Sequence, residues 1–252
     1  MFVRNEKEIQ IIAGPCSVES EKQLFITACS LQKQGVHILR GGIWKPRSRA
    51  HHFEGVGEPG LKWMQQVRQK LGMKVTTEVC TSRQVELALK YDIDMLWIGA
   101  RTTVNPFIMQ ELADILKGTN VPVMLKNPVC PDLELWTGAV ERLLDNEVKL
   151  FSLIHRGFSV LDAAPYRNAP YMEIALKMKE RFPFLPLLCD SSHICGKRDL
   201  LRDISIQALD SGMDGLFIES HSCPNEALSD AAQQLTPEDF GKMLVQMDVC
   251  VQ

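Results

Sequence analysis

Four residues that lie far apart in the sequence carry side chains of the kinds that bind divalent transition metals: Cys16, His193, Glu219 and Asp230. A thiolate, an imidazole and two carboxylates suit manganese, iron, cobalt or zinc without selecting one of them. Each residue also has a simpler interpretation, Cys16 as a small buried residue, His193 as a core histidine, and Asp230 as a helix cap. The four residues therefore predict a metal site only if the fold brings them together.

Seven basic residues form a second set, and each lies at or soon after the end of an apolar run: Arg40, Lys45, Arg47, Arg49, Arg101, Lys126 and Arg156. The chain as a whole carries a formal net charge of −3, so these cations mark a local feature. The guanidinium fork matches the geometry of phosphate and carboxylate groups. Any one of the seven could be a solvated loop residue, but together they predict a pocket for small molecules with two or more anionic groups.

Eight short apolar runs, separated by amphipathic helical patterns, are expected to supply the strands that position these residues. The expected strands are Ile9–Ala13, Val36–Arg40, Lys74–Val79, Met95–Gly99, Pro122–Lys126, Leu150–Ile154, Pro186–Cys189 and Gly215–Glu219. Helix starts and stops predict helices at Glu21–Gln34, Arg83–Lys90, Phe107–Lys117 and Phe240–Met247. Eight such units with no linker between them predict a single (β/α)8 barrel domain over residues 1–252, with a doubly wound open sheet as the alternative.

The barrel makes a specific prediction about the candidate residues. The carboxyl ends of all barrel strands meet at one rim, and that rim carries the active site in barrels of this kind. Both sets of residues lie at or after strand ends. Closure of the barrel also makes the first, seventh and eighth strands adjacent, which is expected to bring Cys16, His193 and Glu219 together.

Composition excludes several classes of protein. Hydrophobic residues make up 45% of the 252 residues, which is enough for a large core and excludes an intrinsically disordered chain. There is no run of about 18 apolar residues to span a membrane, and the near-neutral charge balance argues against nucleic acid as a partner. Residues 1–6 show no secretion signal, so a cytoplasmic protein is expected. The eight cysteines contain no Cys-x-x-Cys pair, which disfavours disulfides and a zinc ribbon.

Eight short segments, taken in order, closely resemble those of the type I 3-deoxy-D-arabino-heptulosonate 7-phosphate (DAHP) synthases, in a short unregulated form close to the octulosonate 8-phosphate synthases. These segments are Gly14-Pro15-Cys16-Ser17, Lys45-Pro46-Arg47-Ser48, Ile98-Gly99-Ala100-Arg101, Leu125-Lys126-Asn127-Pro128, Ile154-His155-Arg156-Gly157, Asp190-Ser191-Ser192-His193, Ile218-Glu219-Ser220-His221 and Ala227-Leu228-Ser229-Asp230. The resemblance extends from about residue 9 to residue 247. It implies a barrel enzyme that condenses phosphoenolpyruvate with erythrose 4-phosphate, releases phosphate and begins the shikimate pathway of aromatic amino acid biosynthesis.

The resemblance also implies roles for individual residues. Cys16, His193, Glu219 and Asp230 would bind the divalent metal, with Mn²⁺ expected and Fe²⁺, Co²⁺ or Zn²⁺ as alternatives. The residues implied to hold phosphoenolpyruvate are Arg40, Lys45, Arg101, Lys126, Arg156 and the backbone of Ala100. Arg47 and Ser48 would hold the aldose phosphate. The catalytic residues would be Lys45 as proton donor, Glu78 as the residue that orients a water, and His193, which Asp190 would orient.

The segment Ser48-Arg49-Ala50-His51-His52 departs from the family pattern, in which a threonine usually follows Lys-Pro-Arg. Arg49 is expected to point to solvent, and the two histidines are left outside the site. The nearest alternative function is a 3-deoxy-D-manno-octulosonate 8-phosphate synthase, which uses arabinose 5-phosphate. Lys45-Pro46-Arg47 favours the four-carbon aldose, because that family typically has Lys-Ala-Asn-Arg there.

Two other classes of function remain open. A Schiff-base aldolase could use Lys126 as its nucleophile, although it would leave the four metal-type residues unexplained. A silent barrel could instead regulate a chorismate mutase, and an association with that enzyme is a further expectation. The resemblance also leads us to expect a homodimer or homotetramer and a chain that aromatic amino acids do not inhibit.

Overall fold

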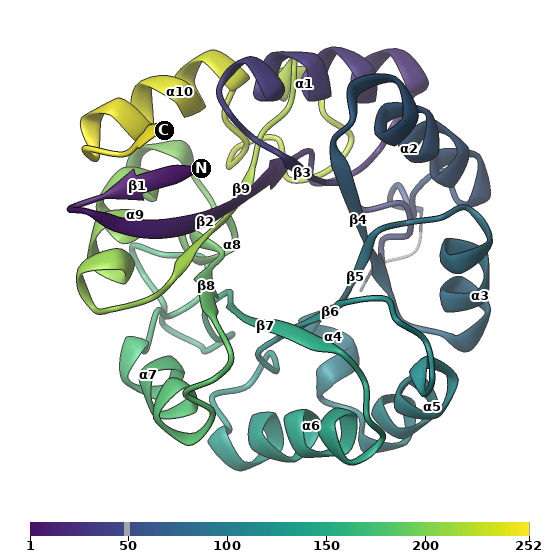
Figure 1. The fold of residues 1–252 in the computed structure, drawn as a ribbon. Coiled ribbons are helices and arrows are strands. Elements are labelled where there is room, and N and C mark those ends of the chain that lie inside the picture. The colour runs from purple at the N-terminus through teal and green to yellow at the C-terminus, as the bar shows by residue number, and fades with distance from the viewer. Residues whose placement is uncertain (48–50, 252) are drawn as a thin grey trace.

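Parallel strands close into a barrel, and helices surround it (Figure 1). The computed structural model describes residues 1–47 and 51–251, and in these residues the barrel has eight strands. They are β2 (Lys7–Gly14), β3 (Ile38–Arg40), β4 (Lys74–Val79), β5 (Met95–Ile98), β6 (Val123–Lys126), β7 (Leu150–His155), β8 (Leu187–Cys189) and β9 (Gly215–Glu219). The expectation of a single (β/α)8 barrel is confirmed, and the open sheet is wrong because β9 pairs with β2.

The helices follow the strands in the expected order. They are α1 (Glu21–Lys33), α2 (Glu58–Leu71), α3 (Ser82–Lys90), α4 (Ala100–Thr103), α5 (Pro106–Leu116), α6 (Leu133–Asp145), α7 (Met172–Arg181), α8 (Ser191–Cys195), α9 (Leu201–Asp210) and α10 (Pro237–Gln246), with 3-10 turns at Arg198–Leu200 and Pro224–Glu226. The expected starts carry real caps: Thr81 accepts from Gln84 N, and Asn105 accepts from Phe107 N ahead of Pro106. Sequence patterns missed the short helices α4 and α8, which lie directly after strands.

Closure of the barrel rests on the pairing of its first and last strands. The register runs in parallel from Gln10 beside Gly215 to Gly14 beside Glu219. Strand β8 lies on the other side of β9. The carboxyl ends of β8, β9 and β2 are therefore neighbours, as the sequence predicted.

An antiparallel hairpin at the N-terminus was not expected from the sequence. Strand β1 (Phe2–Arg4) pairs with the beginning of β2, and β10 (Cys250–Val251) pairs with β1. Asn5 and Glu6 both have positive φ at the turn, which suits a tight two-residue hairpin. The two ends of the chain consequently lie side by side (Figure 1).

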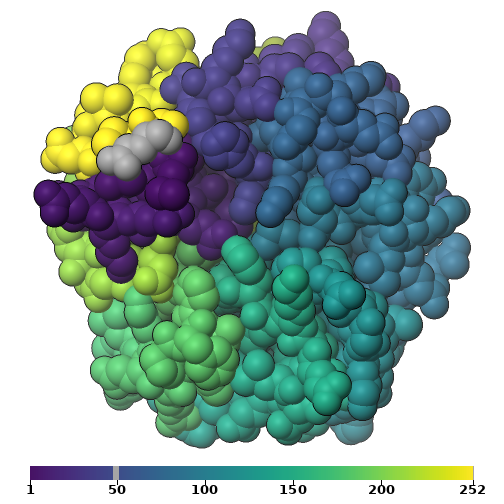
Figure 2. Space-filling model, in the orientation of Figure 1, coloured from purple at the N-terminus to yellow at the C-terminus, as the bar shows by residue number. Residues whose placement is uncertain are grey.

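Apolar side chains fill two regions of the barrel. The larger lies between the strands and the helices, and the smaller lies inside the barrel. The inner region consists of Ile12, Met95, Trp97, Met124, Ile154, Leu188 and Phe217. Trp97 and Phe217 meet edge to face with ring centroids 5.3 Å apart. Side chains thus close the centre of the ring in the space-filling view (Figure 2), so the barrel is a packed core and not a pore. Among the described residues, no helix is long and apolar enough to cross a membrane.

Two aspartates bracket neighbouring strands at the end of the barrel away from the rim. Asp94, just before β5, accepts hydrogen bonds from Val75 N on β4 and from Arg68 on α2. Asp214, just before β9, accepts from Leu187 N on β8 and from Lys179 on α7. In each case one carboxylate joins a strand, the preceding strand and the helix that leads into that preceding strand.

The Asp214 bracket is expected to contribute measurably to stability. Burial alone would raise the pKa of Asp214, but the bonds from Lys179 and Leu187 outweigh it and lower that pKa below its ordinary value. Replacing a charged hydrogen-bond partner costs about 1.5–3 kcal/mol. We therefore expect Asp214→Asn to lower the free energy of unfolding by about that amount in urea titrations at pH 7.

The effect of Asp214→Asn should depend on pH in a definite direction. A carboxyl group with a lowered pKa stabilises the fold above its ordinary pKa, and that stability is lost as pH falls through the folded-state value. The difference between wild type and Asp214→Asn should therefore shrink as the pH is lowered below the ordinary aspartate range. Asp145→Asn, at an exposed position, serves as the control. A difference that does not vary with pH would contradict the assignment.

Candidate active site

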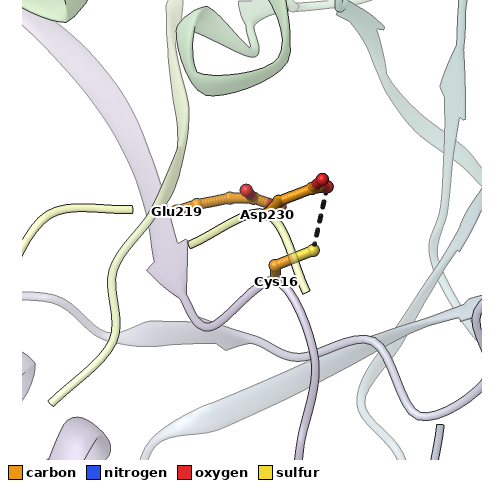
Figure 3. Close-up of side chains that lie close together, drawn as sticks. All are labelled: Cys16, Glu219 and Asp230. Carbon is orange, nitrogen blue, oxygen red and sulfur yellow. Dashed lines mark hydrogen bonds between the residues drawn. The ribbon is translucent and has the colours of Figure 1, made fainter. Parts of the chain in front are cut away.

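Three of the four candidate metal ligands converge where β2 and β9 end (Figure 3). Cys16 follows β2, Glu219 is the last residue of β9, and Asp230 lies on the segment between β9 and α10. One ligand atom from each lies within 4.8 Å of the other two. The thiol of Cys16 is 3.4 Å from Asp230 Oδ2, the contact drawn as a dashed line in Figure 3.

His193, the fourth candidate ligand, points at the same cluster from α8. Its Nε2 lies 3.7 Å from Glu219 Oε1 and 3.9 Å from Asp230 Oδ2. Its Nδ1 lies 2.8 Å from Asp190 Oδ2, and Asp190 also accepts from the His193 backbone N–H as the N-cap of α8. Asp190 therefore fixes the ring and leaves Nε2 directed at the carboxylates.

The chemistry of these donors fits a divalent transition metal. Burial lowers the pKa of His193 and so favours the neutral ring that metals bind. Burial, aided by Glu219, raises the pKa of the Cys16 thiol to about 12, so this thiol keeps its proton until a cation displaces it. Burial opposes ionisation of Asp230, but His193 and Arg167 lower its pKa below the ordinary value. Sulfur, nitrogen and two carboxylates are thus available in one place.

A cavity of about 410 Å³ opens next to this cluster on the same rim. Its lining includes nine residues expected from the sequence to act on substrate or metal, namely Lys45, Arg47, Glu78, Ala100, Arg101, Lys126, Arg156, His193 and Asp230. Strand ends or the turns after them supply most of these residues. The structure therefore joins the cationic set and the metal-type set into one site.

The lysines of the cavity have different partners. Lys126 Nζ lies 2.6 Å from Asp190 Oδ2, and burial lowers its pKa. Lys45 Nζ donates to Cys16 O at 3.0 Å. Burial would lower the pKa of Lys45, but acidic groups that include Glu78 raise it, so Lys45 is a protonated donor at neutral pH.

Close packing places Glu78 and Arg156 at the wall of the cavity. A Cβ on Gly99 would come within 1.9 Å of Glu78 Oε1, so the glycine leaves room for that carboxylate. The guanidinium of Arg156 donates to Asn168 Oδ1 at 2.9 Å, and its backbone N–H donates to Asn127 Oδ1 at 2.7 Å. Burial lowers the pKa of Arg156 to about 10, which still leaves it charged at neutral pH.

Arg40 takes a position that the sequence pattern did not predict. Its side chain is 1% exposed and donates to Glu219 Oε1 at 3.0 Å. The guanidinium carbon also lies over the rings of Trp97 and Phe217, at 5.1 and 4.5 Å from their centroids. Arg40 thus contacts a candidate metal ligand directly, and its contact with phosphoenolpyruvate stays a prediction.

The residues after Lys45-Pro46-Arg47 contribute little to the described site. Ser48 and Arg49 lie outside the described residues. His51 and His52 are exposed, and in the described ranges they do not join the Cys16, Glu219 and Asp230 cluster.

The sequence interpretation missed three cavity residues on one loop. Ser159, Arg167 and Asn168 line the cavity, and all three lie between β7 and α7. Arg167 Nη1 lies 3.0 Å from Asp230 Oδ1. None of the three closes an apolar run, so a rule based on strand ends could not find them. The available signal was the length of the segment 156–171 that follows a barrel strand.

Comparison with known proteins identifies the family of the chain. The profile of the DAHP synthetase I family matches residues 2–252. A phospho-2-dehydro-3-deoxyheptonate aldolase from Thermotoga maritima is 34% identical over 94% of this chain and 68% of its own length. A 2-dehydro-3-deoxyphosphooctonate aldolase from Helicobacter acinonychis is 27% identical over 95% of this chain and 94% of its own length.

Solved structures point the same way. The crystal structure of the Thermotoga maritima DAHP synthase superposes with a TM-score of 0.85 at 34% identity, covering 95% of this chain and 68% of that one. A truncated form of the 3-deoxy-D-arabino-heptulosonate 7-phosphate synthase from Thermotoga maritima gives 0.82 at 30% identity, covering 98% and 90%. The chain therefore belongs to the DAHP synthetase I family, the aldol-type transferases that condense phosphoenolpyruvate with erythrose 4-phosphate at the start of the shikimate pathway.

Proposed function

We propose that residues 1–252 form a single catalytic domain whose rim cavity carries out this condensation with a divalent metal. The observation that carries the proposal is the position of four metal-type ligands in and beside a cavity lined by cations. Phosphoenolpyruvate and erythrose 4-phosphate are both anionic, and a cationic cavity suits both of them.

Four cations of the cavity are assigned to phosphoenolpyruvate. Lys126, Arg101 and Arg156 line the cavity with Lys45 and neutralise its phosphate and carboxylate, while the backbone N–H of Ala100 adds a donor. Arg40 is assigned to phosphoenolpyruvate as well, and its guanidinium donates to Glu219 Oε1. Arg47 lines the cavity too, and we assign it, together with Ser48, to the aldose phosphate.

Cys16, His193, Glu219 and Asp230 are assigned as the metal ligands, with Mn²⁺ as the metal proposed and Fe²⁺, Co²⁺ or Zn²⁺ as alternatives. Bound there, the metal supplies Lewis acidity that makes the aldose carbonyl more electrophilic. Asp190 keeps His193 in the tautomer that has Nε2 free to bind.

The remaining chemistry is assigned to side chains of the cavity. Carbon three of phosphoenolpyruvate bonds to the aldose carbonyl carbon, and Lys45 Nζ gives the new alkoxide its proton. Glu78 orients a water that adds to carbon two. The adduct then loses inorganic phosphate, and Arg101 and Arg156 stabilise the negative charge that develops. Two substrates and one water thus yield one seven-carbon phosphate and free phosphate.

We also propose that the chain assembles as a homodimer or homotetramer. The support is the exposure of two large apolar side chains, Phe107 at the start of α5 and Leu161 on the β7–α7 loop. Burial of such side chains favours association. Sedimentation equilibrium should give a mass of two or four chains, and a monomer at micromolar concentration would overturn the proposal.

A metal requirement is the first expected outcome of this assignment. Exhaustive chelation should abolish phosphate release from the two substrates, and added Mn²⁺ should restore it. Cys16→Ser should lose tight Mn²⁺ binding, because a hydroxyl does not become an anionic ligand near neutral pH. Cys29→Ser on α1 is the matched control and should bind Mn²⁺ as the wild type does. Full turnover by metal-free protein would refute the assignment.

Aldose choice is the second expected outcome. The kcat/KM for erythrose 4-phosphate should exceed that for arabinose 5-phosphate. Arg47→Ala should weaken binding of erythrose 4-phosphate by about 1.5–3 kcal/mol, roughly ten- to a hundredfold. The control is Arg83→Ala, an exposed arginine on α3 that pairs with Glu86. If Arg47→Ala instead raises only the KM for phosphoenolpyruvate, the assignment is wrong and Arg47 binds phosphoenolpyruvate.

A further inference from the structure

The two carboxylates of the metal cluster each turn one oxygen toward the cluster and one away from it. Glu219 Oε1 and Asp230 Oδ2 are the oxygens that lie near His193 Nε2, at 3.7 and 3.9 Å. Their other oxygens, Glu219 Oε2 and Asp230 Oδ1, have different partners. A single pair of residues, Arg167 and Gln233, holds both of these outer oxygens.

Arg167 and Gln233 form a continuous bridge between the two ligands. Arg167 Nη1 donates to Asp230 Oδ1 at 3.0 Å and to Gln233 Oε1 at 2.9 Å. The amide of Gln233 then donates from Nε2 to Glu219 Oε2 at 2.7 Å. Gln233 is 1% exposed, so its amide has these partners in place of water. The three links measure 2.7–3.0 Å, within the usual range for N–H···O hydrogen bonds.

The bridge is also fixed to the helix that carries His193. The Arg167 backbone N–H donates to Ile194 O at 3.0 Å. Gly196, the C-cap of α8, has φ of +68°, and a Cβ there would come within 2.5 Å of Arg167 Cβ. The stem of Arg167 is therefore packed against α8 while its guanidinium reaches Asp230.

Asp230 needs such support more than the other ligands do. Glu219 belongs to a central strand, and His193 belongs to a capped helix. Asp230 lies on an irregular segment with its own backbone in the left-handed region at φ of 49°. Fixing a free carboxylate costs conformational entropy at the moment of binding unless other groups have already fixed it.

From this geometry we propose that Arg167 and Gln233 are positioning residues that hold the outer oxygens of Asp230 and Glu219 and thereby set the affinity of the site for its metal. This inference rests on the proposed metal-dependent function. It predicts that loss of the bridge weakens metal binding, whereas the chemistry at saturating metal is retained. Partners of this kind are typically worth ten- to a hundredfold, roughly, in metal affinity.

Gln233→Met is the sharper test, because it keeps the length of the side chain, removes both hydrogen bonds and changes no charge. The Mn²⁺ dissociation constant, measured from the electron paramagnetic resonance signal of free Mn²⁺, should rise about ten- to a hundredfold. Gln32→Met is the matched control, since the Gln32 amide donates to Leu71 O away from the site. The Gln32 variant should bind Mn²⁺ as the wild type does.

Arg167→Lys is the second variant, and it keeps the positive charge but loses the planar fork. It should weaken Mn²⁺ binding in the same direction. Arg167→Ala is unsuitable, because it also removes a cation that repels the metal. The matched control is Arg68→Lys: Arg68 and Arg167 are 42% and 44% exposed, and each pairs with one aspartate.

The outcomes separate the bridge from the proposed function. Wild-type protein that binds none of Mn²⁺, Fe²⁺, Co²⁺ and Zn²⁺ would refute the metal-dependent function itself. Wild-type binding with unchanged dissociation constants in both Gln233→Met and Arg167→Lys would overturn the bridge alone. An Arg167→Lys variant with a raised KM for the aldose and unchanged Mn²⁺ affinity would instead make Arg167 a substrate-binding residue. The bridge is supported if both variants bind Mn²⁺ more weakly than the wild type, recover kcat at high Mn²⁺ and keep the melting temperature of the metal-free wild type.

Discussion

The parallel pairing of β2 with β9 is the constraint on which the site depends. It sets Gly14 beside Glu219 and so places Cys16, two residues further along, next to the end of β9. With β8 on the other side, the helix that carries His193 begins at the same corner. Residues that are about 200 positions apart in sequence thereby become neighbours. Without closure of the sheet, Cys16 would be separated from Glu219, although β8 would still pair with β9.

Charge balance explains how so many ionised groups can share this corner. Buried charges are tolerated when they are paired and hydrogen-bonded. Glu219 pairs with Arg40, Asp190 with Lys126, and Asp230 with Arg167. The cations that remain, such as Arg156 and Arg101, face the cavity. The metal cluster and the anion pocket therefore form one electrostatic unit, in which the carboxylates and the cations each lower the free-energy cost of burying the other.

Sequence patterns predicted the architecture well because the barrel repeats one local rule, an apolar strand followed by a capped helix. Lys74–Val79 and Gly215–Glu219 match their strands in full, whereas the strands expected to begin at Pro122 and Pro186 begin one residue later. Proline has no N–H to give to the ladder. The sequence patterns did not predict the N-terminal hairpin, because Phe2–Arg4 is too short to show an alternation of apolar and polar residues. The positions of Arg167 and Asn168 depend on long-range packing of an irregular loop, which no local pattern encodes.

The two aspartate brackets sit before β5 and β9, which are the fourth and eighth strands of the barrel. They therefore fasten the ring at opposite points, on the face that takes no part in catalysis. Such a division of labour makes the molecule a favourable scaffold for engineering. Loops at the rim can be exchanged to accept sugars of other lengths, because the aspartates that join neighbouring strands at the base are not among the residues that would be redesigned.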